Sequence, residues 1–141
     1  MPDGVIAQYA KALNLRDLFD YTSIAIELGV LDNTSAKDFL ADKLLIGGGS
    51  EFGIFPKSWL VPTLTQLGQV GQVFLQRHAD RIRTYDNLRV RTIGWLSEHL
   101  GSFLVLRHLR EMYSNNIPAN VFGYMTMVVE EGQPFLPGRV G

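Results

Sequence analysis

The sequence contains no cysteine. This absence excludes disulfide bonds, thiolate metal ligands and cysteine nucleophiles, and it fits a reducing compartment. The chain also lacks an apolar run long enough to span a membrane, and it lacks the basic and apolar stretches of a secretory signal. We therefore expect a cytoplasmic protein with no membrane span.

Charged residues are few, at 19% of the 141 residues, and they nearly cancel to a net charge of −1. Apolar residues make up 46%, which is enough to build a core and argues against disorder. The balance hides two opposed halves. Residues 1–46 carry four basic and seven acidic residues, a net of −3, whereas residues 53–141 carry nine and six, a net of +3. Halves of opposite charge attract each other.

The stretch Gly47-Gly48-Gly49-Ser50-Glu51-Phe52 separates these halves. Gly-Gly-Gly-Ser is a common flexible spacer, Glu-Phe is what an EcoRI site encodes in frame, and such spacers behave as random coil. We therefore favour an engineered join over a natural loop. The predicted domains are three short helices in 1–46, a linker at 47–52, and a helical domain with an extended C-terminal tail in 53–141. The two parts would be a binding segment tethered to its partner, or one protein from which a loop or membrane segment was removed.

Apolar spacing predicts an all-α fold, with five or six helices in a bundle-like or orthogonal array around a central helix at about 88–113. The other predicted helices are Val5–Leu13, Leu15–Leu28, a helix from a cap at 34–38 to the glycines, and Thr63–Ile82, which we begin after Pro62 because proline breaks a helix interior. For 119–131 helix and strand are both open, and helix is favoured because no second strand is evident to pair with it.

Small residues form one face of the central helix. Gly94, Ser97 and Gly101 span two helical turns and therefore lie nearly one above another. A neighbouring helix can approach closely along such a face. Gly68 and Gly71 are the expected partners within the chain, and the same face of a second copy is the alternative.

No residue pattern indicates an enzyme. His99 and His108 lie nine positions apart and face opposite sides of one helix, and His78 lies beside Arg77 and Arg81, where cations repel a metal. The sequence has no Gly-x-Ser-x-Gly nucleophile elbow and no phosphate-binding glycine loop. We therefore predict no catalytic residue, no metal, no cofactor and no small-molecule substrate.

Arginine is concentrated in one region. The set comprises Arg77, Arg81, Arg83, Arg89, Arg91, Arg107 and Arg110. Arginine favours bidentate contact with carboxylate or phosphate groups. Three interpretations are open: pairing with acids of the first segment such as Asp17, Asp20, Asp38 and Asp42, contact with an acidic protein partner, or contact with the phosphates of a nucleic acid. The last makes a nucleic-acid-binding or nucleoprotein-like domain the alternative function.

The leading hypothesis is a non-enzymatic helical module for protein–protein interaction or assembly. Its expected binding residues are apolar: Phe39, Leu40, Leu44 and Leu45 from the first segment, and Trp95, Phe103, Leu106 and Tyr113 from the second. The first segment is too short to bury its own apolar faces, so it needs the second segment or another chain. The expected partner is a protein, or a second copy of this chain, bound by helix-in-groove packing.

Overall fold

The computed structural model describes residues 4–51, 53–121, 127–128 and 134–135. The predicted all-α class is confirmed. The elements are α1 (Gly4–Ala12), α2 (Leu15–Glu27), α3 (Asn33–Ala41), η1 (Gly49–Glu51), α4 (Lys57–Arg83), η2 (Arg89–Arg91), α5 (Thr92–Met112), η3 (Ala119–Val121), and two short strands, β1 (Met127–Val128) and β2 (Pro134–Phe135). The chain divides into two units, Met1–His108 and Leu109–Gly141, with the boundary inside α5.

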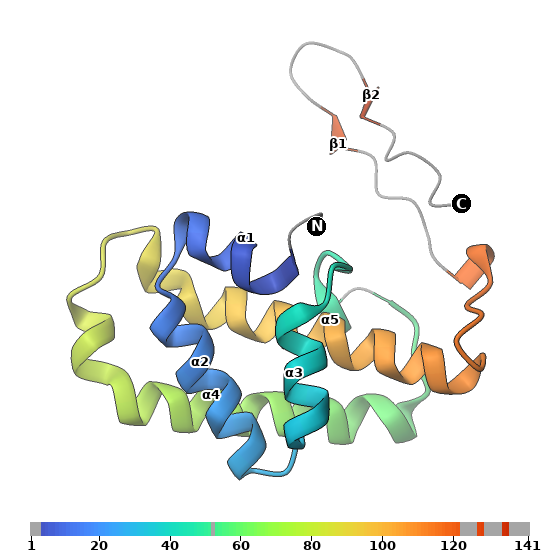
Figure 1. Ribbon diagram of the computed structural model, residues 1–141, viewed down its shortest axis with the longest axis horizontal. Helices are drawn as coiled ribbons and strands as arrows, with labels where there is room; N and C mark the ends of the chain where they lie inside the picture. The colour runs from blue at the N-terminus through green and yellow to red at the C-terminus, as the bar shows by residue number, and fades with distance from the viewer. Residues whose placement is uncertain (1–3, 52, 122–126, 129–133, 136–141) are drawn as a thin grey trace. The chain divides into compact units, whose positions relative to one another are not determined.

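Two long helices, α4 and α5, form an antiparallel hairpin in the first unit (Figure 1). Three contacts follow their pairing: the rings of Trp59 and His108 stack at 4.7 Å, Leu67 reaches Gly101, and Ile93 reaches Gly71. The residues 101–106 of α5 are all buried. This helix therefore has the central position that its apolar residues on several sides predicted.

The three short helices pack on this hairpin and share its core. Figure 1 shows α2 lying across α4 and α5, with α1 and α3 beside it. The Tyr21 ring of α2 meets the Phe74 ring of α4, and the Phe39 ring of α3 meets the Phe103 ring of α5. One hydrophobic cluster thus includes residues from all five helices. Burial of this kind is the main favourable contribution to folding.

Helix ends differ from the sequence prediction at α3, α4 and α5. The central helix predicted at about 88–113 begins at Thr92, because residues 89–91 form the separate 3₁₀ turn η2. α4 begins at Lys57, so Pro62 lies inside the helix. Because proline has no backbone N–H, one carbonyl in the exposed first turns lacks its usual helical hydrogen bond. The Pro56 carbonyl instead accepts the first helical bonds, from the amides of Trp59 and Leu60. α3 ends at Ala41 rather than at the glycines, because the backbone turns extended at Asp42.

The end of the chain is also not helical throughout. Met127–Val128 is a strand that pairs antiparallel with Pro134–Phe135. The helix favoured over 119–131 is therefore wrong at 127–128, because the pairing partner that the sequence analysis did not find lies at 134–135. The ranges 122–126, 129–133 and 136–141, which include most of the predicted tail, lie outside the described residues.

The glycine-rich segment adopts a defined turn on α5. The Ile46 amide donates to Ser102 Oγ at 2.7 Å, and the Gly48 amide donates to Glu98 Oε1 at 2.7 Å. Gly49 has a φ of +54° and is buried, as is Ser50. This geometry differs from the random coil expected of a Gly/Ser spacer, because each of these contacts fixes the backbone. That the segment is an engineered join stays a prediction.

The small face of α5 accommodates this turn rather than a helix. A Cβ on Gly101 would lie 3.2 Å from Ser50 Oγ and 3.5 Å from a Leu67 methyl group. Ser97 instead bonds to the Tyr21 hydroxyl at 3.2 Å, and Gly94 has open space around it. The expected helix-to-helix approach of Gly94, Ser97 and Gly101 on Gly68 and Gly71 is therefore wrong, because the backbone of 49–50 lies against Gly101.

Gly49→Ala tests whether this turn is part of the fold. A Cβ there would lie 2.9 Å from both the Glu98 carbonyl oxygen and the Ser102 amide, and φ is positive. We expect a loss of about 2–4 kcal/mol in the free energy of unfolding, measured by urea denaturation. Gly29→Ala is the matched control, since Gly29 also has a positive φ but open surroundings, and its cost should be about 1 kcal/mol. Equal and small losses would show that 47–51 is a free tether.

Candidate functional site

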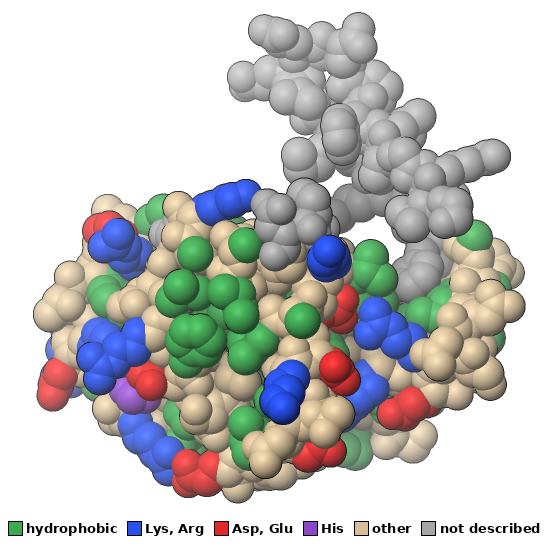
Figure 2. Space-filling view, viewed as in Figure 1, with side chains coloured by type: hydrophobic (Ala, Val, Ile, Leu, Met, Phe, Trp, Pro, Cys, Tyr) green, Lys and Arg blue, Asp and Glu red, His purple; other side chains and the backbone are tan. Residues whose placement is uncertain are grey.

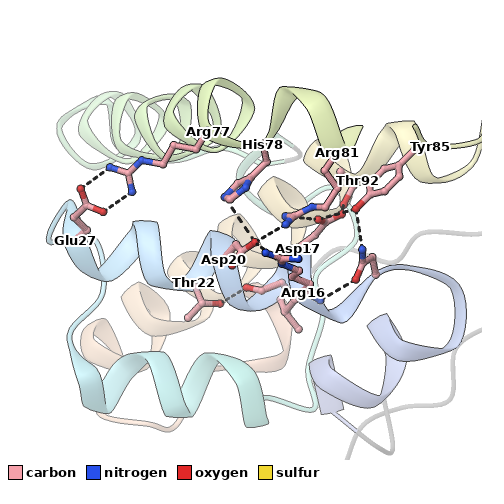
Figure 3. A network of polar contacts seen from close by, with 12 residues as sticks. Arg16, Asp17, Asp20, Thr22, Glu27, Arg77, His78, Arg81, Tyr85 and Thr92 are labelled. Carbon is pink, nitrogen blue, oxygen red and sulfur yellow. Dashed lines mark hydrogen bonds and ion pairs between the residues drawn. The ribbon is translucent and has the colours of Figure 1, made fainter. Parts of the chain in front are cut away.

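A buried carboxylate, Asp17 of α2, lies at the centre of a polar network (Figure 3). Its Oδ1 accepts the Tyr85 hydroxyl proton at 2.9 Å and pairs with the Arg81 guanidinium at 2.7 Å. Its Oδ2 accepts the Thr92 hydroxyl proton at 3.0 Å. The network therefore joins α2 to the end of α4, to the connection that follows it, and to the start of α5.

Further bonds extend this network to α1. The Tyr9 and Thr92 hydroxyls lie 2.6 Å apart, and Asn14 donates a side-chain N–H to the Tyr85 oxygen at 2.9 Å. Burial, together with the bond donated to Asp17, raises the pKa of the Tyr85 hydroxyl. Burial also raises the pKa of Tyr9. Both hydroxyls therefore stay protonated at neutral pH and remain donors.

A second carboxylate, Asp20, lies one turn further along α2. Arg81 spans both acids, because its second nitrogen lies 2.8 Å from Asp20 Oδ2. His78, where α4 departs from helical φ and ψ, places Nε2 3.7 Å from the same oxygen. Burial and the neighbouring Arg81 charge lower the pKa of His78. The imidazole is therefore neutral at pH 7.

This network is suited to holding helices together. Asp17 has no exposed surface and each of its oxygens already accepts a donor of the chain, so a substrate outside the core cannot reach this carboxylate. A buried ion pair with every oxygen engaged fixes one helix arrangement, whereas its loss leaves an unpaired buried charge. In the part of the chain that the structure describes, no group of three or more His, Asp or Glu residues is placed to hold a metal ion.

The predicted arginine set is divided by the structure. Arg81 pairs with Asp17 and Asp20, as one of the three interpretations expected, and Arg77 makes a bidentate pair with Glu27 at 2.6 and 2.7 Å. The hydrogen bonds from Arg77 lower the pKa of Glu27. Of the remaining arginines, Arg83 pairs with Asp80, and Arg107 lies over the Phe103 ring. Arg89 and Arg91 are exposed. Arg110 belongs to the second unit.

The predicted apolar binding residues are mostly within the core of the chain. Phe39, Phe103 and Leu106 are buried, and the first two contact each other across α3 and α5. Leu44 is 49% exposed. The remaining four, Leu40, Leu45, Trp95 and Tyr113, are partly buried, and Tyr113 belongs to the second unit. The structure thus brings the two predicted segments together at Phe39 and Phe103, and their part in binding a separate partner stays a prediction.

α4 has an exposed apolar surface that was not expected from the sequence. Val61, Leu64 and Leu75 are 50%, 43% and 41% exposed. Together with Gly68 they fall within a sector of about 60° on one side of the helix. From Ser58 to Gln76, about five turns, the sequence has no charged residue. We call Val61, Leu64, Gly68 and Leu75 the neutral face of α4. The charge-free run is the signal that could have located it.

A second apolar surface is visible on the first unit. Figure 2 shows hydrophobic side chains gathered over α1, α2 and α3, with lysine, arginine and acidic side chains around them. The large apolar residues that α1 and α2 expose include Ile6 at 37% and Phe19 at 44%. In the described residues, no helix has the length and apolar character needed to cross a membrane.

Asp17→Asn tests the network. Removing the charge leaves Arg81 paired only with the more exposed Asp20 and replaces one acceptor oxygen of the buried network by an amide, so we expect a loss of about 2–4 kcal/mol in the free energy of unfolding, measured by urea denaturation. Asp80→Asn is the matched control, because Asp80 forms an ion pair with Arg83 at a side chain that is 97% exposed. The control should leave the unfolding midpoint unchanged. Equal effects of the two substitutions would contradict a structural role for the buried pair.

The pKa of His78 predicts a pH dependence. A lowered pKa means that the unfolded chain binds the proton more readily than the folded chain, so stability falls as the pH drops through the ordinary histidine value of 6.5. We expect the melting temperature to decrease between about pH 7 and pH 5.5. His78→Gln should flatten this part of the profile. An unchanged slope in that variant would show that His78 does not cause it.

Comparison with known proteins gives no relative. No family model matches the chain, and no curated protein or solved structure is significantly similar to it. What the chain does must therefore be argued from the surfaces and contacts described above.

Proposed function

We propose that the chain is a non-enzymatic helical module for protein–protein interaction. The observation that carries this proposal is the neutral face of α4. Three large aliphatic side chains are about half exposed there, on a helix side without a charged residue for about five turns. Charged residues are depleted at the centres of protein interfaces because their desolvation is costly.

The neutral face is not needed to complete the core. An adjacent side of α4, centred about 110° around the helix from the neutral face, supplies Leu67, Val70 and Phe74, which are buried against the other helices. Exposed aliphatic groups on the neutral face lose contact with water only when a second molecule covers them. Burying such area contributes about 25 cal/mol per Å². A partner protein would therefore gain most of its binding energy at this face.

The arginine set gives less support to the alternative of a nucleic-acid-binding domain. Arg77, Arg81 and Arg83 each pair with a carboxylate of the chain. A phosphate would have to displace those carboxylates. Glu27, Asp17 and Asp20 of the first segment, together with Asp80, thus neutralise three of the seven arginines, whereas Arg89 and Arg91 are exposed.

A triple variant tests the proposal. Val61→Gln/Leu64→Gln/Leu75→Gln keeps the size and helix preference of the face but removes its apolar character. We expect a melting temperature within about 5 °C of the parent, because the side chains are exposed. We also expect the variant to lose proteins that the parent captures, including its own copies, whereas Gln66→Glu on another side of α4 should retain them. Retention of every captured protein, or a much larger loss of stability, would contradict the proposal.

A further inference from the structure

We propose that the neutral face of α4 binds the same face of a second copy, with the two helices antiparallel about a two-fold axis at Gly68. This inference rests on the proposed function and names its partner. It follows from the spacing of the face, from the surroundings of Gly68, and from the absence of charge.

Two aliphatic residues of the face are placed symmetrically about Gly68, whereas the position that mirrors Leu64 is Gln72. Val61 lies seven residues before it and Leu75 seven residues after it. In an antiparallel pair centred on Gly68, Val61 of each copy therefore meets Leu75 of the other. Seven residues are close to two turns, so all three positions stay on one side of the helix. A two-fold interface requires such a self-complementary surface.

No contact with the described part of the chain requires a glycine at position 68. A Cβ built on it would have no atom within 4 Å, and the residue is exposed. Glycine at an exposed helix position costs about 1 kcal/mol relative to alanine. Close approach of another helix backbone is what a glycine permits and a larger residue prevents. We therefore place the two-fold axis of the proposed dimer at Gly68, where two helix backbones can come close together.

The charge-free run favours a second copy over a partner recognised by its charge. Two identical surfaces that carry charge repel each other unless opposite signs alternate across the axis. From Ser58 to Gln76 that repulsion does not arise. Among the side chains that border the aliphatic groups, Gln72 of one copy lies next to Thr65 of the other in this register, so the two can form a hydrogen bond.

The size of the face predicts a weak dimer. Val61 to Leu75 spans about 21 Å of helix. One such helix pair buries less than the roughly 800 Å² per partner of a standard stable interface. We therefore expect dissociation in the micromolar to millimolar range, so that the mass of the protein depends on its concentration.

Sedimentation velocity of the full chain tests the dimer. From about 10 µM to about 1 mM the average mass should rise from one chain toward two. Leu64→Glu should keep the protein monomeric over that range, because the dimer would bury two carboxylates near its axis. Gln66→Glu is the matched control, since it adds the same charge to an exposed site about 200° around the helix, and it should associate like the parent.

A cross-link locates the axis. The chain has no cysteine, so Gly68→Cys introduces a single thiol into open space. With oxidised glutathione as the oxidant, two such thiols on facing helices should form a disulfide-linked dimer, and Gln66→Cys should not. A disulfide needs Cα atoms about 4.4–6.8 Å apart, which only the axial position provides.

The outcomes separate this inference from the proposed function. A parent protein that stays monomeric at about 1 mM, or equal cross-linking at positions 68 and 66, would overturn the dimer. If the triple glutamine variant still lost a different captured protein, the interaction function would stand with another partner. If neither self-association nor capture depended on the face, both would fail.

Discussion

The arrangement of the first unit depends on one buried ion pair. Asp17 has no exposed surface, and its two oxygens are shared among Arg81, Tyr85 and Thr92. These three partners come from the end of α4, the connection after it and the start of α5. Because an unpaired carboxylate in the interior is costly, α2 has one low-energy position against the hairpin. Apolar packing alone would tolerate several.

The same pair shows how the opposed charges of the two segments meet within the fold, although Arg89 and Arg91 are exposed. The acids of α2 face the arginines at the end of α4, so Arg77 and Arg81 are engaged within the chain. Charge complementarity here contributes specificity to the fold. Between Ser58 and Gln76 α4 carries no charged side chain, so the binding that we propose there is apolar.

The glycine-rich turn and the neutral face show two different uses of glycine. At Gly49 the backbone has a positive φ and lies against α5, so a side chain would collide with Glu98 and Ser102. At Gly68 the backbone is helical and nothing surrounds it. The first glycine serves the interior of the chain. The second is unfavourable for the isolated helix, and the proposed dimer gives it a purpose.

The sequence by itself determined the helical class and the central position of the last long helix, because apolar periodicity is a local property. It offered the pairing of Arg81 with Asp17 and Asp20 only as one of three interpretations. It did not determine the start of α4, which continues through the proline signal at Pro62, or the short strand at 127–128, because its partner at 134–135 has only two residues and contains a proline, which disfavours strands. Only the tertiary structure decided which side of α4 is buried. Leu67 and Leu64 are the same residue type in one helix, yet Leu67 contacts Gly101 and Leu64 is exposed. This difference in exposure depends on where α5 packs against α4. The apolar periodicity of α4 alone carries no information about that position.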